Sequence, residues 1–193
     1  MCGIVGYIGK EKKAEKVVLE GLYRLEYRGY DSAGLAYVEN NEVKVVRAKG
    51  AVKGLDDKCQ SIQPQDLAIG HTRWATHGKP SEENAHPHLS FKRELALVHN
   101  GIIENYKYLK ELLRDEGYIF SSETDTEVLA NWIEHTMLQG ELSLEDAVHQ
   151  ALKSVHGAYA IAVIEPNAEM IVCAKKSSPL AVGLAEDSFI VGS

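Results

Sequence analysis

Apolar positions along this chain follow two periods, one typical of buried strands and one of amphipathic helices. The stretch Gly3 to Ile8 is almost continuously apolar and predicts a buried strand close to the N-terminus. From Lys12 to Tyr27 the apolar residues recur every three or four positions, which predicts a helix with one buried face. Short apolar runs bounded by polar or turn residues predict further strands at 35–38, 43–47, 67–71, 95–99, 158–164, 170–174, 180–182 and 189–191.

Three more helices are predicted in the second half of the chain, at 106–116, 124–138 and 143–155. Gly117 is placed to end the first of them. Thr124 and Glu127 have the spacing of a capping box, and Ser143 is a suitable N-cap for the last helix. Strands at both ends with helices between them favour an α/β (α+β) fold of two sheets covered by helices.

Composition narrows the class of protein. The chain has 193 residues, enough for one domain with a substantial core or two small ones, and no repeat or low-complexity linker divides it. Its net charge of -7 includes no basic block, which argues against binding to nucleic acid or to an anionic membrane. The N-terminus lacks the pattern of a signal peptide, and no apolar run reaches the ~20 residues of a membrane span. We therefore expect a soluble, cytoplasmic domain.

Cys2 is the first candidate for chemistry. Removal of Met1 would leave Cys2 with a free α-amine, whose reference pKa is roughly 7.7–8.0. Such an amine can take the thiol proton, so one residue would supply both the nucleophile and its base. On position alone, a small apolar residue opening a buried strand is the simpler interpretation. Cys59 and Cys173 have no partner spacing that indicates a disulfide or a zinc site.

Four further residues have both a chemical and a structural interpretation. Asn100 and Gly101 follow a predicted strand and suit either an oxyanion hole, built from a side-chain amide and a backbone N–H, or a tight turn. Arg73 suits either a carboxylate clamp or a surface ion pair. Asp125 suits either an ammonium site or helix capping. Taken singly, Asn100 and Gly101 favour the turn, and capping is the commoner use of an aspartate at the position of Asp125.

Several histidines raise the question of a metal site. They are His71, His77, His86, His88 and His99. The segment from His86 to His88 has no cysteine or carboxylate at a recognisable ligand spacing. We therefore interpret the histidines as hydrogen-bonding loop residues and expect no metal.

The order of motifs is more informative than any one of them. The chain carries CGIVG at 2–6, LEYRGYDSAGL at 25–35, HTRWATHG at 71–78, HNGIIEN at 99–105 and SETDTE at 122–127. Together these resemble the class II glutamine amidotransferases and, more narrowly, the glutaminase domain of the glutamine–fructose-6-phosphate aminotransferases, also called glucosamine-6-phosphate synthases. The resemblance runs over essentially the whole chain.

The resemblance implies the N-terminal-nucleophile hydrolase fold, a four-layer α/β/β/α sandwich. It implies Cys2 as nucleophile with its own amine as base, and Asn100 and Gly101 as the oxyanion site. It implies that Arg73 binds the α-carboxylate of L-glutamine and that Asp125 binds its α-ammonium group. The implied glutamine-binding loop residues are Trp74, Thr76, His77 and His86.

The resemblance also implies partners outside residues 1–193. In the family, a C-terminal sugar-phosphate isomerase part uses the ammonia to convert fructose 6-phosphate to glucosamine 6-phosphate. We expect residues 1–193 to be a single domain cut from such a longer chain, needing no cofactor, with a homo-oligomeric full-length protein. Two alternatives stay open: another ammonia acceptor, as in amidophosphoribosyltransferase, and a non-catalytic module that senses glutamine or binds metal.

Overall fold

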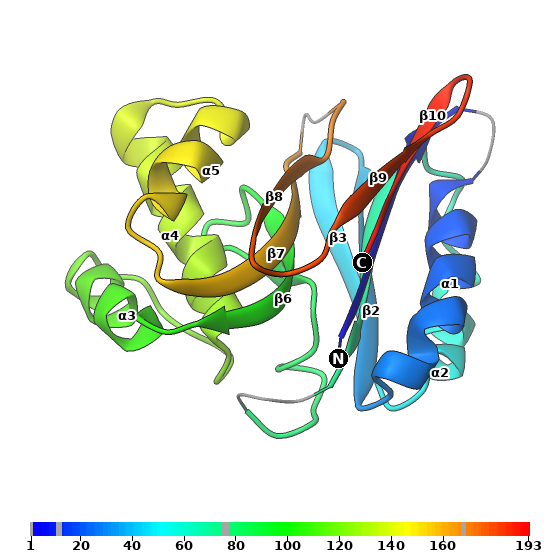
Figure 1. The fold of residues 1–193 in the computed structure, drawn as a ribbon, viewed down its shortest axis with the longest axis horizontal. Coiled ribbons are helices and arrows are strands. Elements are labelled where there is room, and N and C mark those ends of the chain that lie inside the picture. The colour runs from blue at the N-terminus through cyan, green and yellow to red at the C-terminus, as the bar shows by residue number, and fades with distance from the viewer. Residues whose placement is uncertain (1, 11–12, 75–77, 167–168) are drawn as a thin grey trace.

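Two antiparallel sheets lie face to face, and helices cover the outer face of each (Figure 1). The computed structural model describes residues 2–10, 13–74, 78–166 and 169–193. The strands are β1 Gly3–Gly9, β2 Ser32–Glu39, β3 Glu42–Lys49, β4 Leu67–Arg73, β5 His88–Leu89, β6 Ala96–Ile103, β7 Gly157–Ile164, β8 Val172–Lys176, β9 Ala181–Leu184 and β10 Ser188–Gly192. The helices are α1 Ala14–Leu25, α2 Val52–Cys59, α3 Tyr106–Asp115, α4 Asp125–Gly140 and α5 Leu144–Leu152, with a short 3-10 turn at Glu26–Arg28.

The two sheets have different sizes and different helical covers. The larger has the order β3-β2-β4-β1-β10-β9 and carries α1 and α2, whereas the smaller has the order β5-β6-β7-β8 and carries α3, α4 and α5. All the pairings between strands are antiparallel. The layers therefore run helix, sheet, sheet, helix, which is the sandwich expected from the sequence.

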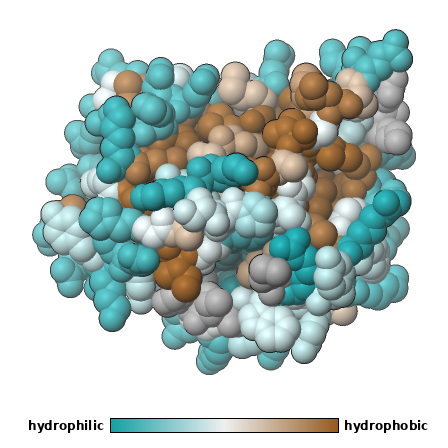
Figure 2. All heavy atoms as spheres, in the orientation of Figure 1, coloured by the Kyte–Doolittle hydropathy of each residue, from teal (hydrophilic) through white to brown (hydrophobic). Residues whose placement is uncertain are grey.

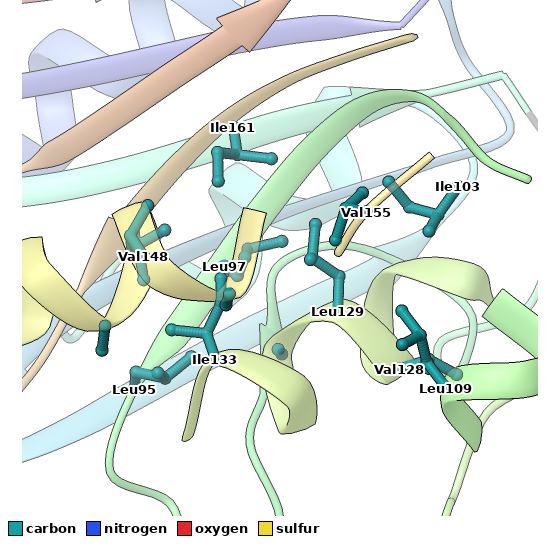
Figure 3. Packing of buried hydrophobic residues seen from close by; sticks show 14 of the residues in the cluster. Leu95, Leu97, Ile103, Leu109, Val128, Leu129, Ile133, Val148, Val155 and Ile161 are labelled. Carbon is teal, nitrogen blue, oxygen red and sulfur yellow. The ribbon is translucent and has the colours of Figure 1, made fainter. Parts of the chain in front are cut away.

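Three buried clusters hold these layers together. One fills the space between the smaller sheet and its helices, where Leu129 and Ile133 of α4 lie beside Leu97 of β6 (Figure 3). A second packs Val18 and Leu22 of α1 against the larger sheet. The third lies between the sheets and consists mainly of small or β-branched residues: Ile4, Ala36, Val43, Leu67, Ile69, Ala96, Val98, Ala160, Ala162 and Ile164.

The nine strands and four helices predicted from the sequence are present, with boundaries that differ by a few residues. The largest error concerns Asn100 and Gly101, which were expected to end a strand. β6 continues through both to Ile103, because β7 pairs with it along its whole length, with Asn100 opposite Ala160 and Gly101 opposite Tyr159. The tight-turn interpretation is therefore wrong.

Two elements were not predicted. Helix α2 is short and contains a glycine, but Val52, Leu55 and Cys59 form a buried stripe at helical spacing. Strand β5 has only two residues and lies within a polar stretch, so the sequence pattern gave no sign of it. The capping box is also incomplete: Thr124 accepts the Glu127 N–H, whereas the Glu127 carboxylate binds Ser121 and Ser122 instead of closing the box.

One edge of the larger sheet is apolar and exposed. All four residues of β9 are exposed, and so are Phe189 and Ile190 of β10. Figure 2 shows hydrophobic residues, in brown, gathered over the region where Figure 1 places these two strands. Among the described residues, no helix has the length and apolar character needed to cross a membrane.

Four buried histidines cluster at one end of the sandwich. His71 lies on β4, His88 on β5 and His99 on β6, and His86 precedes β5. The rings of His71 and His86 lie 4.2 Å apart, and those of His86 and His88 lie 5.0 Å apart. Burial lowers the pKa of His71 to about 3 and holds the pKa values of His86 and His88 well below the ordinary value. Three of the four are strand residues, so the expectation of loop histidines is wrong for them.

These neutral histidines should make the fold sensitive to acid. Below the ordinary histidine pKa of 6.5 the histidines of the unfolded chain become protonated, whereas the buried imidazoles of the folded chain stay neutral. The free energy of unfolding should therefore fall as the pH drops below that value, by up to about 1.4 kcal/mol per pH unit for each of His71, His86 and His88. For His71 the loss continues until about pH 3, where the folded imidazole also becomes protonated.

Urea denaturation at several pH values between neutral and mildly acidic checks this. His88→Gln should make the dependence of stability on pH shallower. His149→Gln, at an exposed position, should leave the dependence unchanged. Equal slopes for the wild type and His88→Gln would contradict the assignment of a neutral buried His88.

Candidate active site

A cavity of about 360 Å³ lies where the ends of β1, β4 and β6 meet the N-terminus of α4. Strand alternation explains why polar side chains gather there. Side chains two or four positions apart on a strand point to the same side. On β1, β4 and β6, a residue of the core between the sheets has a polar residue at such a spacing. The pairs are Ile4 with Cys2, Ile69 with His71 and Arg73, and Val98 with Asn100. The cavity is thus the polar end of the core between the sheets.

The Cys2 thiol is partly buried at the cavity wall. The backbone N–H of Trp74 donates to its Sγ at 3.2 Å, and Sγ lies 3.5 Å from the Trp74 carbonyl oxygen. Burial raises the pKa of the thiol, while the Trp74 N–H and the nearby Arg73 charge partly offset that rise. The sulfur is therefore a thiol at neutral pH unless a base removes its proton.

The Asn100 side chain lies beside Cys2 in a defined orientation. Its Nδ2 donates to the Cys2 carbonyl oxygen at 3.2 Å and to Ser193 Oγ at 3.0 Å. Its Oδ1 accepts from His71 Nε2 at 2.9 Å, and the same nitrogen also lies 3.0 Å from the His99 carbonyl oxygen. The amide therefore presents its donor group to Cys2 and its acceptor to the sandwich interior.

Gly101 has a backbone that requires glycine. Its φ is +132°, and a Cβ built there would lie 2.0 Å from the Ala158 carbonyl oxygen on the paired strand β7. No other residue fits without moving that strand. Gly101 thus lets the backbone adopt this conformation beside the cavity while the β6–β7 ladder continues.

Arg73 and Asp125 occupy the same cavity, and both are buried. Arg73 is 3% exposed and donates through Nη2 to the Gly78 carbonyl oxygen at 3.2 Å. Burial lowers its pKa, and the negative charges near it, including those of Asp31 and Asp125, act in the opposite direction. The surface ion-pair interpretation of Arg73 is therefore wrong.

Asp125 is the first residue of α4 and is 4% exposed. Its Oδ2 accepts the Ile103 N–H at 2.8 Å, which ties the start of α4 to the end of β6. The N-cap of α4 is Thr124, so the interpretation of Asp125 as a capping residue is wrong. The cavity therefore holds a buried cation and a buried anion close to a thiol.

The remaining candidates differ in position. Trp74 lines the cavity, is 47% exposed and packs edge-on against Tyr30 with ring centroids 5.7 Å apart. His86 also lines the cavity and is buried. Thr76 and His77 lie outside the described residues.

The sequence analysis missed other residues of this site. His71 and Ser193 both contact Asn100, and Arg28, Thr126 and Ser178 line the cavity. The sequence could have indicated His71, because His71 lies two positions before Arg73 on one predicted strand, and the two side chains therefore share a face. No sequence pattern could have indicated Ser193, because the end of β10 comes close to Cys2 through the pairing of β10 with β1. Within the described ranges, no group of three or more His, Cys, Asp or Glu side chains is arranged to hold a metal ion.

Comparison with known proteins supports one family. The sequence profile described as "Glutamine amidotransferase domain" matches residues 71–193. The glutamine–fructose-6-phosphate aminotransferase [isomerizing] of Bacteroides thetaiotaomicron is 52% identical over the whole chain, which covers 32% of that protein. The enzyme of the same name from Clostridium perfringens is 50% identical, again over the whole chain and over 31% of its own length. The chain thus spans about a third of the length of these curated relatives.

Solved structures agree on the fold. The glutamine phosphoribosylpyrophosphate amidotransferase of B. subtilis, complexed with ADP and GMP, superposes with a TM-score of 0.84 and 30% identity. That match covers 99% of this chain and 41% of the other. The expected N-terminal-nucleophile hydrolase fold, with two sheets between helical layers, is confirmed. Because the profile matches well over half of the chain and relatives of 50–52% identity align along all of it, this chain belongs to the class II glutamine amidotransferase domain family.

Proposed function

We propose that this domain hydrolyses the side-chain amide of L-glutamine to glutamate and ammonia through a thioester on Cys2. The observation that carries the proposal is the content of one cavity: a thiol, an amide donor directed at the thiol residue, a buried guanidinium and a buried carboxylate. These are the groups that acyl transfer from a free amino acid requires. Residues 1–193 act as a single domain in this proposal.

In the first step the Cys2 thiol transfers its proton to the α-amine of the same residue, exposed once Met1 is removed. The thiolate attacks the amide carbon of glutamine, and the carbonyl oxygen becomes an oxyanion. Asn100 Nδ2 and the Gly101 N–H stabilise that oxygen, with Nδ2 exchanging its present contacts for the oxyanion. The carbon–nitrogen bond then breaks, and the ammonium group formed from the α-amine gives its proton to the departing ammonia.

In the second step a water molecule attacks the thioester carbon. The α-amine takes a proton from this water and returns it to the sulfur as the carbon–sulfur bond breaks. Glutamate leaves, and the free thiol is restored. The sum is glutamine and water giving glutamate and ammonia, with the chain unchanged.

The state of the thiol supports the α-amine as base. Burial raises the pKa of Cys2, so an adjacent proton acceptor is needed at neutral pH. Cys2 Sγ forms hydrogen bonds with the Trp74 backbone, and His71 Nε2 is already engaged with Asn100. The amine lies on the nucleophile's own residue and needs no further positioning.

Arg73 and Asp125 support recognition of the amino-acid end of the substrate. A guanidinium binds a carboxylate through two parallel hydrogen bonds, and a buried carboxylate favours an ammonium group. In this proposal Arg73 holds the α-carboxylate and Asp125 the α-ammonium group, while Trp74, Thr76, His77 and His86 surround the bound amino acid. A solvated pair would discriminate less, because water screens its charges.

The proposed acceptor of the ammonia is that of the relatives with the higher sequence identity. Relatives of 50–52% identity are named glutamine–fructose-6-phosphate aminotransferases, whereas the phosphoribosylpyrophosphate amidotransferase is 30% identical. We propose that the ammonia serves conversion of fructose 6-phosphate to glucosamine 6-phosphate in a longer cytoplasmic, homo-oligomeric protein that includes an isomerase part.

Replacement of the nucleophile is the first test. Cys2→Ala should reduce glutamate release by about 10⁴-fold or more, as expected for loss of a catalytic nucleophile. Intact mass of the wild type should show a chain without Met1. The control is Cys173→Ala, since Cys173 lies outside the cavity and burial raises its pKa to about 11. This control should keep wild-type turnover.

Two results would contradict the proposal. One is a wild type that has lost Met1, binds glutamine and still releases no glutamate, which would make the domain a glutamine-binding module. The other is a Cys2→Ala variant as active as Cys173→Ala.

Asp125→Asn tests recognition of the ammonium group. The asparagine oxygen can still accept the Ile103 N–H, so the variant removes the charge and keeps the fold contact. We expect KM for glutamine to rise roughly ten- to a hundredfold, the scale of one charged hydrogen bond. Asp115→Asn, an exposed change at the end of α3, is the matched control and should leave KM unchanged.

A substrate analogue sharpens this test. Glutaramate, which is glutamine without the α-amine, should react poorly with the wild type and equally poorly with Asp125→Asn. If Asp125→Asn weakens glutamine and glutaramate by the same factor, Asp125 does not bind the ammonium group.

The acceptor is tested by product analysis. The 193-residue chain should release glutamate and ammonia and form no amino sugar from fructose 6-phosphate. A chain in which this domain replaces the corresponding part of the Bacteroides thetaiotaomicron relative should form glucosamine 6-phosphate. A chimera that releases ammonia from glutamine but forms no glucosamine 6-phosphate would contradict this acceptor and favour another.

A further inference from the structure

The hydrogen bond between His71 and Asn100 joins the two sheets directly behind the proposed oxyanion site. We infer that His71 is a positioning residue, which holds the Asn100 amide with its NH₂ group toward Cys2 and so determines whether an oxyanion site exists at all. The inference deepens the proposed glutaminase activity and rests on it for its kinetic consequences. The orientation of the amide itself can be measured without turnover.

The partners of His71 Nε2 define its protonation state. This nitrogen lies 2.9 Å from Asn100 Oδ1 and 3.0 Å from the His99 carbonyl oxygen. A carbonyl oxygen only accepts hydrogen bonds, so Nε2 must carry the proton and donate. Burial lowers the pKa of the ring to about 3, so the ring is neutral and Nδ1 carries no proton at neutral pH. His71 is therefore a fixed donor.

Because His71 Nε2 can only donate, it favours one of the two orientations of the Asn100 amide over the other. In the observed one, Oδ1 accepts from His71 while Nδ2 donates to the Cys2 carbonyl oxygen and to Ser193 Oγ. Rotating the amide by half a turn would bring Nδ2 against the His71 donor and Oδ1 against the Cys2 carbonyl oxygen. Both contacts would then be repulsive, and the one with His71 is buried, where such repulsion costs most.

The consequence for catalysis is specific. An amide oxygen facing Cys2 would repel the oxyanion, whereas the NH₂ group stabilises it. Loss of His71 should therefore lower the rate of the chemical step and leave the contacts of Arg73 and Asp125 with glutamine intact. The Ser193 hydroxyl cannot replace His71, because a hydroxyl tolerates either orientation of the amide by turning its own hydrogen.

Glutamine and methionine provide a matched pair of substitutions at position 71. The two side chains have similar length and volume. The His99 carbonyl oxygen only accepts, so it favours a glutamine that presents its NH₂ group there, where this group also reaches Asn100 Oδ1; methionine has no donor. We expect His71→Met to reduce kcat for glutamine by about ten- to a hundredfold with KM nearly unchanged, below the full 10²–10³ for loss of one oxyanion donor. His71→Gln should recover kcat to within about threefold of the wild type. A role in packing alone would give the two variants equal kcat.

A double-mutant cycle with Asn100→Ala separates positioning from general destabilisation. In the Asn100→Ala background, His71→Met should cause little further loss of kcat, because there is no amide left to orient. Additive losses, or a His71→Gln variant as slow as His71→Met in the presence of Asn100, would overturn the inference.

A measurement independent of activity decides the case in which the wild type fails to hydrolyse glutamine. In ¹⁵N-labelled protein the side-chain NH₂ signals of Asn100, assigned by their absence in Asn100→Ala, report on its hydrogen bonds. Slow hydrogen exchange of these protons in the wild type and His71→Gln, and faster exchange in His71→Met, would support the inference. Equal exchange rates in all three would refute it whatever the outcome for the glutaminase proposal.

Discussion

The close approach of two sheets through small side chains is the constraint on which the rest of the structure depends. Alanines at four positions of the core between the sheets, Ala36, Ala96, Ala160 and Ala162, leave room for the strands to pack face to face. Because strand residues alternate between faces, the apolar runs of β1, β4 and β6 that enter this core continue, at one end, into polar residues on the same face. The cavity is therefore a continuation of the core. Its walls come from strands of both sheets and from the start of α4.

Burial at this end of the sandwich has opposite consequences for different groups. It keeps the histidines neutral, so they act as directional donors and acceptors rather than as charges. It raises the pKa of the Cys2 thiol, so the nucleophile depends on a base. Arg73 and Asp125 lie in the same cavity, where the Asp125 charge partly offsets the lowering of the Arg73 pKa by burial. A site with one buried cation and one buried anion is suited to a zwitterionic amino acid.

Local pattern predicted most of the secondary structure because the faces of these helices and strands are strongly apolar. It failed where pairing over long range decided the outcome. Asn100 and Gly101 form the commonest turn dipeptide, yet β7 continues to pair with β6 past them and keeps both in an extended strand. Strand β5 exists only because β6 lies beside it. Motif order along the chain, in contrast, identified the family and the residues Cys2, Arg73, Asn100 and Asp125, all of which line one cavity.

The sequence by itself determined which residues carry reactive groups and which faces of the strands and helices are buried, because both follow from side-chain chemistry and short-range periodicity. Only the tertiary structure decided how those groups are oriented. The bond from His71 to Asn100 connects residues on different sheets, and the bond from Asp125 to the Ile103 N–H connects a helix to a strand. Such contacts depend on the register of strand pairing and on the packing of layers. No local pattern contains that information, because the residues involved lie about twenty to thirty positions apart in the chain.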